Sequence, residues 1–201
     1  MTHVMLDLET LGTMPGCVVL SVGACTFDPH DDPQAPWIGR SFNLNIERSS
    51  CEGHGLTAEP DTLAWWERQS EEARARLLTE PYSLFVVATE FHAWWRRVGG
   101  VYLWCNGAAF DEPIWRVAAE KVHSTVPWKY WNVRDTRTVW DIGKVNPRNI
   151  ARDGVAHSAY ADARHQAKCV TLAYANLKRM QPYLFPPVSI RGPVPAGPEV
   201  A

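Results

Sequence analysis

Several features are scarce in this sequence of 201 residues, and each absence narrows the class of protein. No run of 18 apolar residues occurs, so no membrane-spanning helix is expected. No basic segment followed by an apolar stretch opens the chain, so we expect no signal peptide and a cytoplasmic location. The formal net charge is only −2, which provides no strongly basic field for tight, non-specific binding to duplex nucleic acid.

Cysteine is also sparse: the chain has five, an odd number, and no CxxC pattern. Neither a disulfide framework nor a zinc ribbon is therefore expected, and most of these residues are predicted to be small core side chains. Hydrophobic residues, by contrast, make up 46% of the chain, enough for one domain with a substantial core. The ten tryptophans include Trp65–Trp66 and Trp94–Trp95. Core packing is the first interpretation of these pairs, and stacking of an exposed member on a base is the alternative.

The hydrophobic pattern predicts an α/β domain. Residues 4–10, 17–27 and 41–47 have the pattern of strands, and the short Gly- and Pro-containing breaks between them favour an antiparallel meander. Later segments predict helices at 60–80 (capped by Asp61), 83–98, 111–122 and 137–144, and strands at 101–105 and 129–133. The last helix is predicted to follow the cap Ser158 and to end before Pro182, with a buried stripe formed by Ala163, Ala167, Val170, Tyr174 and Leu177.

The expected fold is a mixed sheet, antiparallel in its first three strands and parallel in its later ones, flanked by helices. We expect a single domain over residues 1–183, followed by a proline-rich C-terminal tail at 184–201.

Four carboxylates stand out. Asp7 and Glu9 share one side of the first strand, about 6.6 Å apart along it, and burying such a pair costs free energy unless it is paired or metal-bound. Asp111 follows a predicted strand, and Asp162 lies in the first turn of the last helix. Taken singly, both are explained by the favourable effect of negative charge at a helix N-terminus, and Asp7 with Glu9 by an exposed strand end.

Taken together, the four acids indicate a metal centre. Clustered carboxylate oxygens select Mg²⁺ or Mn²⁺. Two such ions about 3.5–4 Å apart can activate a water and stabilise the leaving oxygen of a phosphoryl displacement. His157, five residues before Asp162, has the chemistry to take the proton of that water, although a loop histidine without a role is the alternative.

The motifs "DLET", "FD" and "HSAYAD", in this order, resemble those of the DEDDh 3′→5′ exonucleases, which have a ribonuclease H-like fold. The stretches "DTLAWWERQSEEAR", "NGAAFDEPIW", "RDTRT" and "HSAYADARHQA" are similar to the exonuclease VIII-like and mycobacterial 3′→5′ exoribonuclease group common in phages. Two positions depart from the frequent pattern: Asn106-Gly107 replaces His-Asn, and Leu11 replaces a second threonine. Both departures leave the substrate preference open.

The resemblance implies roles for individual residues. Asp7 would bridge two metal ions, Glu9 and Asp162 would complete the first site, Asp111 would help hold the second through water, and His157 would be the general base. The terminal nucleotide of the substrate would be contacted by Thr10, Leu11, Phe110 and Asn106.

The implied activity is a metal-dependent exonuclease that releases nucleoside 5′-monophosphates from the 3′ ends of single-stranded or 3′-overhanging DNA or RNA. Related enzymes are often dimers, which leaves a homodimer open. The alternative is a nucleic-acid-binding or protein-interaction module on the same fold, with tryptophans and the proline-rich tail as its working surface.

Other polar residues receive structural interpretations. We expect His165 to face solvent or to support the site indirectly rather than to bind metal, and Asp135 to cap a short helix through its neighbour Thr136. The loop at 145–156 is a candidate mobile element that brings His157 to the substrate. The arginines around this loop fit a phosphate-contacting edge or a solvated surface equally well: Arg134, Arg137, Arg148 and Arg152.

Overall fold

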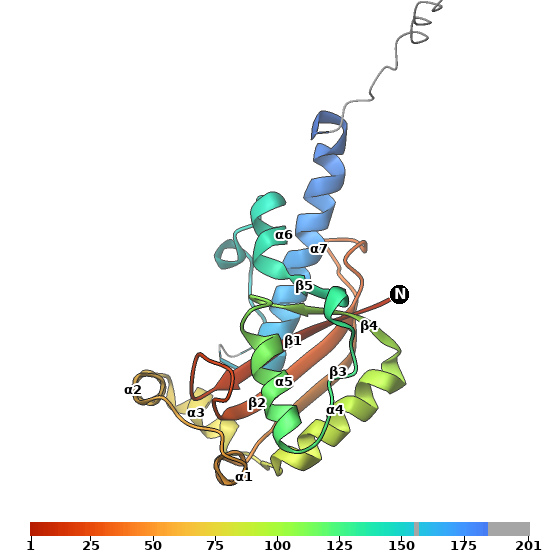
Figure 1. Cartoon of the computed structure of the whole chain (residues 1–201). Coiled ribbons are helices and arrows are strands. Elements are labelled where there is room, and N and C mark those ends of the chain that lie inside the picture. Colours follow the sequence, from red (N-terminus) through yellow and green to blue (C-terminus); the bar gives the residue numbers. More distant parts are fainter. Residues whose placement is uncertain (155–156, 185–201) are drawn as a thin grey trace, which may run out of the picture.

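The computed structural model describes residues 1–154 and 157–184, with side chains as far as residue 180. At its centre is a five-stranded sheet in the order β3-β2-β1-β4-β5 (Figure 1). Strand β1 pairs antiparallel with β2, β2 pairs antiparallel with β3, and β4 and β5 run parallel to β1. The predicted α/β architecture with a mixed sheet is confirmed. The strands are β1 (Thr2–Thr10), β2 (Val19–Phe27), β3 (Ile38–Asn45), β4 (Gly100–Cys105) and β5 (Val133–Asp135).

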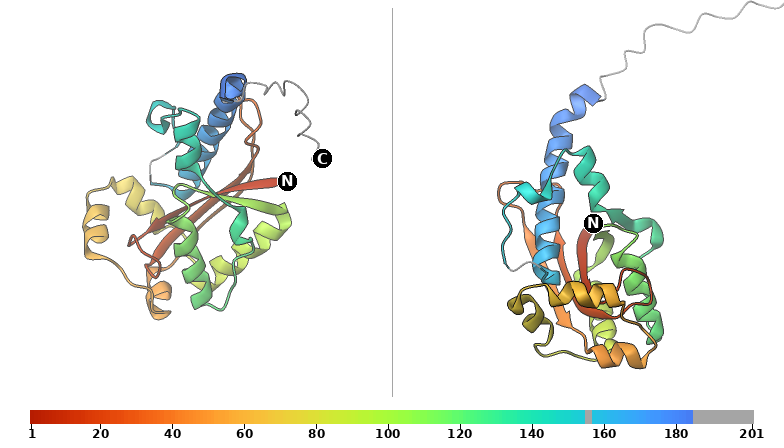
Figure 2. Two further views of the ribbon diagram at one scale, coloured as in Figure 1. Left: turned by 45° about the horizontal axis from the view of Figure 1, so that its top comes forward. Right: turned by 90° about the vertical axis from the view of Figure 1, so that its left-hand side faces the viewer.

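Helices cover both faces of the sheet. Helices α6 and α7 lie on one face and α4 and α5 on the other, while α1, α2 and α3 gather at one end (Figures 1 and 2). The helices are α1 (Arg48–Gly53), α2 (Pro60–Glu67), α3 (Glu71–Leu77), α4 (Leu84–Val98), α5 (Asp111–Lys121), α6 (Thr136–Ile142) and α7 (Ala159–Leu184), and short 3₁₀ turns occur at Tyr130–Asn132 and Pro147–Asn149.

Alternation along β1 divides its side chains between two hydrophobic cores. Leu6 and Leu8 belong to the core beneath α4 and α5, whereas Met5 belongs to the core beneath α7. Because side chains alternate along a strand, Asp7 and Glu9 share the α7 side with Met5. The predicted common orientation of the two acids is therefore confirmed.

Gly23 allows α7 to begin close against the sheet. This residue pairs with Asp7 across β1 and β2, and a Cβ placed on it would lie 2.1 Å from both the carbonyl carbon of Ala159 and the nitrogen of Tyr160. No larger residue fits there without a shift of the backbone. The first turn of α7 is consequently held near the end of β1 that carries the acids.

The predicted helix at 60–80 is wrong as a single element. Two helices occupy this region, because Ser70 begins α3 as its N-cap, with its Oγ accepting a hydrogen bond from the Ala73 nitrogen at 3.2 Å. Asp61 does not cap α2: Glu59 occupies the N-cap position, and Asp61 lies within the first turn. The predicted end of the next helix at Gly99 is confirmed, since this residue takes a left-handed conformation (φ 65°).

Three further boundaries differ from the sequence prediction. The strand expected at 129–133 is a 3₁₀ turn followed by β5, which starts at Val133. Asp135 caps α6 with its own carboxylate, which accepts the Thr138 N–H at 2.8 Å, and not through Thr136, which is buried. Helix α7 continues beyond Pro182 to Leu184, so the predicted end before Pro182 is wrong by three residues, although proline disfavours a helix interior. Apart from Leu184, the predicted tail lies outside the described residues.

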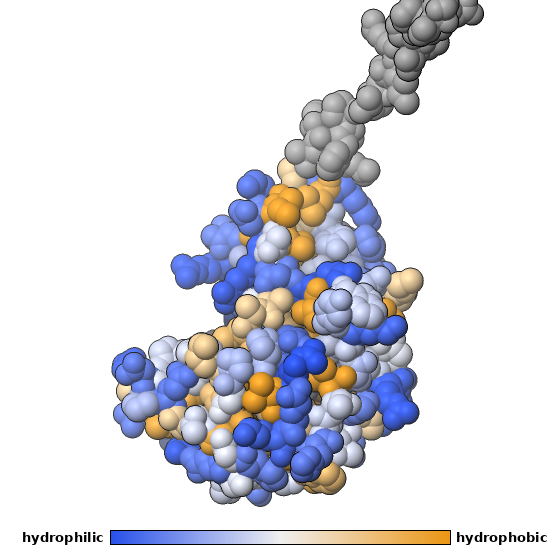
Figure 3. Space-filling model, viewed as in Figure 1, coloured by the Kyte–Doolittle hydropathy of each residue, from blue (hydrophilic) through white to orange (hydrophobic). Residues whose placement is uncertain are grey.

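The remaining expectations concern burial. All five cysteines are free and buried, as expected of small core residues. Seven tryptophans are buried, whereas Trp37, Trp65 and Trp131 are exposed at the surface. Hydrophilic side chains cover much of the face in Figure 3, with smaller hydrophobic patches between them. No helix in the described part of the chain is long and apolar enough to cross a membrane.

Candidate active site

Three carboxylates from the two ends of the domain converge at the end of β1. Oxygen atoms of Asp7, Glu9 and Asp162 all lie within 4.8 Å of one another. Asp162 reaches the other two from the first turn of α7, beside the close contact at Gly23. Glu9 is buried, and Asp7 and Asp162 are partly exposed. We name these three residues the acid cluster.

Asp111 approaches the acid cluster from the other side of β1. It is the first residue of α5 and only 2% exposed, and its Oδ1 accepts a hydrogen bond from the Leu8 N–H at 3.2 Å. Its Oδ2 is buried without a hydrogen-bond partner. The negative charge of Asp111 raises the pKa values of both Asp7 and Glu9, so it lies within electrostatic reach of the cluster although it is not one of the three.

Burial and mutual repulsion make ionisation of this site unfavourable in the absence of a cation. Burial is the main cause that raises the pKa of Asp7 well above its ordinary value, followed by the charges of Asp111 and Glu9. Burial also raises the pKa of Glu9 to about 8 and that of Asp111 to about 7. Four acids gathered in this way require either protons or positive charge.

Two polar side chains partly compensate the negative charge of the acids: Gln166, which the sequence analysis did not single out, and Arg152, which it considered only for a phosphate-contacting edge or a solvated surface. Gln166 is buried on α7 and donates from Nε2 to Oδ1 of Asp7 at 2.6 Å. Arg152 forms an ion pair with Asp162 and lowers the pKa values of Asp7 and Glu9. The spacing of four residues between Asp162 and Gln166 places both on one helix face, which is the signal that could have identified Gln166.

The chemistry of the donor set fits divalent cations. All four acids offer hard carboxylate oxygens, and Glu9 Oε1 and Asp111 Oδ2 are buried without hydrogen-bond partners. Cations placed among these oxygens would compensate the repulsion that raises their pKa values. Asp7, Glu9 and Asp162 are the residues placed to hold them, with Asp111 alongside.

His157 lies directly before α7 but is not a member of the acid cluster. Its backbone has a positive φ of 60°, an uncommon conformation for a residue other than glycine. Its ring meets the Trp65 ring edge-on, with the centroids 4.8 Å apart and an angle of 88° between the planes. Burial and the nearby Arg152 charge lower its pKa, which favours the neutral imidazole that can accept a proton.

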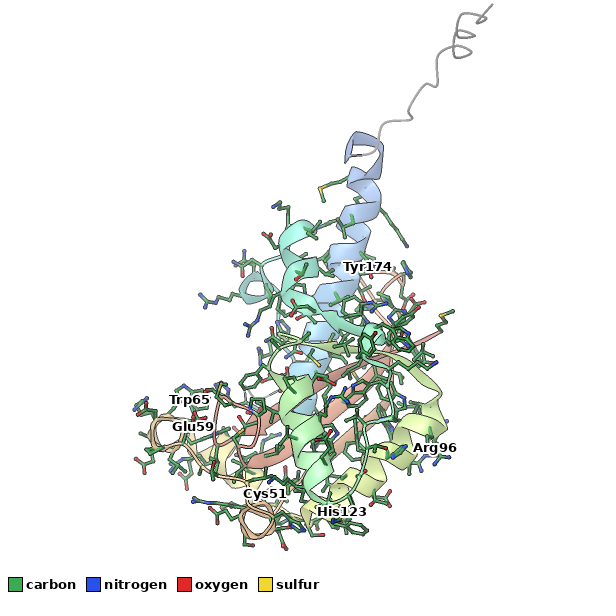
Figure 4. The ribbon with its side chains drawn as sticks, viewed as in Figure 1. Cys51, Glu59, Trp65, Arg96, His123 and Tyr174 are labelled. Atoms are coloured by element: carbon green, nitrogen blue, oxygen red, sulfur yellow. The ribbon has the colours of Figure 1, made fainter. Side chains whose placement is uncertain are left out.

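A groove of about 490 Å³ opens beside the acid cluster. Glu9 and Thr10 line it from β1, Trp65 and Trp66 from α2, and Phe110 from the turn before α5. Trp66 is buried and donates from Nε1 to the Thr10 carbonyl at 2.8 Å, which anchors this wall. Figure 4 shows Trp65 beside Glu59 at the α2 end of the molecule, and both residues line the groove.

The four predicted substrate contacts differ in their access to this groove. Thr10 and Phe110 line it directly. Leu11 is buried, and its backbone is already used: its N–H donates to the Val18 carbonyl at 2.9 Å, and its carbonyl accepts the Glu59 N–H at 2.7 Å. Asn106 is not among the lining residues, and its Oδ1 accepts a hydrogen bond from Arg137 Nε at 3.1 Å.

The four arginines considered as one phosphate-contacting edge do not share a role. Arg152 pairs with Asp162 and Arg137 with Asn106, both near the site. Arg134 donates to the Trp131 carbonyl and lies over the Tyr102 ring, while Arg148 is exposed.

Several contacts join the loop before α7 to that helix, among them the ion pairs of Arg152 with Asp162 and of Asp153 with Lys168. His165 is 5% exposed and bonds to the Pro147 carbonyl at 3.1 Å, so the solvent-facing position, one of its two expected roles, is wrong. The expected mobility of the loop at 145–156 is not tested, and its residues 155 and 156 lie outside the described part of the chain.

Solved structures identify the class of fold. E. coli exonuclease I in complex with a dT13 oligonucleotide superposes with a TM-score of 0.61 at 16% identity, covering 92% of this chain and 43% of that chain. Cell-death related nuclease 4 superposes with a TM-score of 0.53 at 15% identity, covering 89% of this chain and 64% of that one. The chain thus spans less than half the length of exonuclease I, and the likeness supports the expected ribonuclease H-like fold.

The sequence itself identifies the family. Residues 2–174 match the Rv2179c-like 3′-5′ exoribonuclease domain, and the chain therefore belongs to this family of 3′–5′ exonucleases. A further relative is the exodeoxyribonuclease of Enterobacteria phage T4, which is 27% identical over 160 residues, covering 67% of this chain and 68% of the phage protein. The family resemblance inferred from the three motifs is confirmed.

Proposed function

We propose that the chain is a metal-dependent 3′→5′ exonuclease that releases nucleoside 5′-monophosphates from single-stranded or 3′-overhanging nucleic acid. Two Mg²⁺ or Mn²⁺ ions would be held by Asp7, Glu9 and Asp162, with Asp111 completing the second site. The observation that carries the proposal is the approach of the three carboxylates to within 4.8 Å of one another. Family membership and the zinc-bound form of the E. coli exonuclease I complex with single-stranded DNA support it.

The bound cations and the residues around the acid cluster have separate roles in the proposed hydrolysis. Bound cations would supply positive charge at the phosphate and increase the acidity of the attacking water. His157, held neutral by its lowered pKa, accepts the proton as the water oxygen forms its bond to phosphorus. The bond from phosphorus to the 3′ oxygen of the preceding nucleotide breaks, and that oxygen takes a proton from solvent water, while His157 returns its proton to solvent. The product is a nucleoside 5′-monophosphate, with its sugar and base in the groove beside Glu9.

A labelled oligonucleotide tests this function. With Mg²⁺ or Mn²⁺, a 5′-labelled strand should shorten one nucleotide at a time from its 3′ end, and a 3′-terminal label should appear in a nucleoside 5′-monophosphate. Asp7→Asn and His157→Ala should abolish shortening, whereas Asp141→Asn, at a carboxylate 86% exposed on α6, should leave it unchanged. Internal cleavage, or no cleavage of either DNA or RNA, would contradict the proposal.

The same experiment also shows whether the enzyme prefers DNA or RNA as its substrate. The family is described as acting on RNA, and the phage relative as acting on DNA. Matched DNA and RNA strands of one sequence, single-stranded and as 3′ overhangs, should be compared by kcat/KM. Shortening of at least one of them from the 3′ end is the expected result.

A further inference from the structure

A second groove, of about 980 Å³, lies on the other face of the sheet from the acid cluster. Side chains from β2, from β3 and the residue before it, and from the end of α4 line it, and we name it the α4 groove: Thr26, Trp37, Arg40 and Arg97. Thr26 alternates with Cys25, which belongs to the core beneath α7, so Thr26 points to the α4 side of the sheet. Thr26 also lies three residues, about 10 Å, along β2 from Gly23, the partner of Asp7. The sheet therefore separates a ligand in the α4 groove from the acids.

The α4 groove carries positive charge without a neighbouring counter-charge. Arg40 and Arg97 are exposed, and neither forms an ion pair with another described residue. No acidic side chain lines the groove in the part of the chain that the structure describes. The dipole of α4 favours basic residues in its last turn, which accounts for Arg96 and Arg97 but not for Arg40 on the neighbouring strand. The groove thus suits an anion.

A buried hydroxyl group lies in the wall of the α4 groove. Thr26 is 2% exposed, and its Oγ1 has no hydrogen-bond partner among the described residues. A shift in the pairing of β2 with β3 places Gly39 and Arg40 together opposite Thr26, which is the arrangement of a β-bulge. A buried hydroxyl without a partner costs free energy. A phosphate or sugar oxygen that enters the groove beside Thr26 would supply the missing partner.

The Trp37 ring offers a flat surface in the same groove. Asp31 accepts the backbone N–H of Trp37 at 2.6 Å, which ties the residue to the preceding turn. Its ring packs against Gly39, where an added Cβ would lie 2.3 Å from Cη2 and Cζ2 of the indole. The side chain nevertheless remains 54% exposed, so a planar ligand has access to it. Exposed aromatic rings stack on nucleic-acid bases of any sequence.

We propose that the α4 groove is a nucleotide-binding site in which Arg40 and Arg97 hold a phosphate and Trp37 stacks on the base. Its volume is at the upper end of the range of about 300–1,000 Å³ that small-molecule sites occupy, which leaves room for a whole nucleotide. The phosphate and base can belong to a free nucleoside monophosphate or to a single strand. An acidic peptide would match the two arginines but would leave the exposed ring unused.

Binding in EDTA tests this site without any cleavage. Isothermal titration compares adenosine 5′-monophosphate, an eight-nucleotide DNA strand and an eight-residue glutamate peptide on the wild type and on Arg40→Met, Arg97→Met and Trp37→Leu. We expect each substitution to weaken nucleotide binding by about fivefold or more, while Trp37→Phe, which keeps an aromatic ring, retains most of the affinity. Weaker binding of the monophosphate identifies a free nucleotide as the ligand, and weaker binding of the DNA strand alone identifies a strand.

Matched controls separate the site from general effects of charge and aromatic surface. Arg96→Met, beside Arg97 but outside the groove lining, and Trp131→Leu, at a tryptophan 57% exposed elsewhere, should leave both affinities unchanged. Melting temperatures close to that of the wild type establish that the variants are folded. Undiminished binding of both nucleotide probes in all three groove variants, or equal binding of the glutamate peptide, would overturn the inference. Because no step requires hydrolysis, a failure of the exonuclease function would not alter this result.

Discussion

Gln166 donates its side-chain amide to Oδ1 of Asp7 over 2.6 Å and thereby joins the last helix to the first strand across 159 residues of sequence. The amide is buried and follows Asp162 by one helical turn. It satisfies one lone pair of Asp7 and lowers the pKa of that carboxyl, against the stronger effects of burial and neighbouring charge. Gln166 therefore fixes the orientation of Asp7 while leaving its other oxygen free.

Replacing Gln166 by Met keeps the approximate size of the side chain and removes the hydrogen bond. We expect affinity for Mn²⁺ to fall about 10- to 100-fold, the usual cost of losing a group that orients a ligand. Isothermal titration of the EDTA-treated protein measures this, and Gln34→Met, at an exposed position, is the control. Unchanged affinity in Gln166→Met would show that Asp7 is oriented without the amide.

Gly23→Ala tests whether the close approach of α7 assembles the acid cluster. The added Cβ would meet the backbone of Ala159 and Tyr160 at 2.1 Å, so the start of α7 must move. We expect the free energy of unfolding to fall by about 1–3 kcal/mol, and Mn²⁺ affinity to fall with it as Asp162 withdraws. Denaturant unfolding and calorimetric titration check the two effects. Gly53→Ala, at the end of α1 where no atom lies within 4 Å of the added Cβ, should leave Mn²⁺ affinity unchanged and should not lower the free energy of unfolding.

Arg152 competes with cations for Asp162, because its guanidinium already forms an ion pair with that carboxylate. Arg152→Met should therefore raise Mn²⁺ affinity by about fivefold, equivalent to about 1 kcal/mol for a partly exposed pair. The same change should lower the melting temperature of the metal-free protein, since the acids lose their counter-charge. Arg148→Met, at an exposed arginine of the same loop, serves as the control. Weaker Mn²⁺ binding in Arg152→Met would contradict the competition.

Without metal, the stability of the protein should fall as pH rises, which is the opposite of the effect that carboxylates with lowered pKa values have. The pKa of Glu9 is about 8 and that of Asp111 about 7 in the fold, both above the values near 4 expected in the unfolded chain. The native state holds protons that the unfolded chain releases, so these groups lower stability as pH rises from about 4 to about 8. His3, whose pKa burial lowers to about 4, opposes this trend only below about pH 6.5.

The measurement follows from these windows. In EDTA, the melting temperature should fall between about pH 6.5 and about pH 8, where His3 no longer opposes the trend, and saturating Mn²⁺ should reduce the fall because cations replace the protons. A melting temperature that stays level or rises over this range without metal would contradict the raised pKa values.

The sequence predicted the parts of the structure that depend on local pattern. The strand carrying Asp7 and Glu9 and the helix that begins at Asp111 follow from periodicity and end signals in the residues themselves. Of the predicted buried stripe of α7, Ala163, Ala167 and Val170 are buried, whereas Tyr174 and Leu177 are partly exposed. The order of three motifs was sufficient for the family. The break at Ser70 was missed because a single serine cap interrupts an otherwise helical pattern.

What the sequence could not supply was long-range geometry. Nothing near Gln166 in the sequence indicates that its partner is Asp7. Nothing near Gly23 indicates that the start of α7, 136 residues later in the chain, packs against it. The different environments of Trp65 and Trp66 likewise depend on the positions of β1 and His157. These relationships arise from tertiary packing, which local propensity does not encode.

The late position of α7 in the chain has a consequence during synthesis. This helix contributes Asp162 and Gln166, while Asp7 and Glu9 lie on β1 and are made long before them. A ribosome must therefore release nearly the whole domain before the carboxylates can meet. A nascent chain stalled at any earlier codon between them carries an incomplete site.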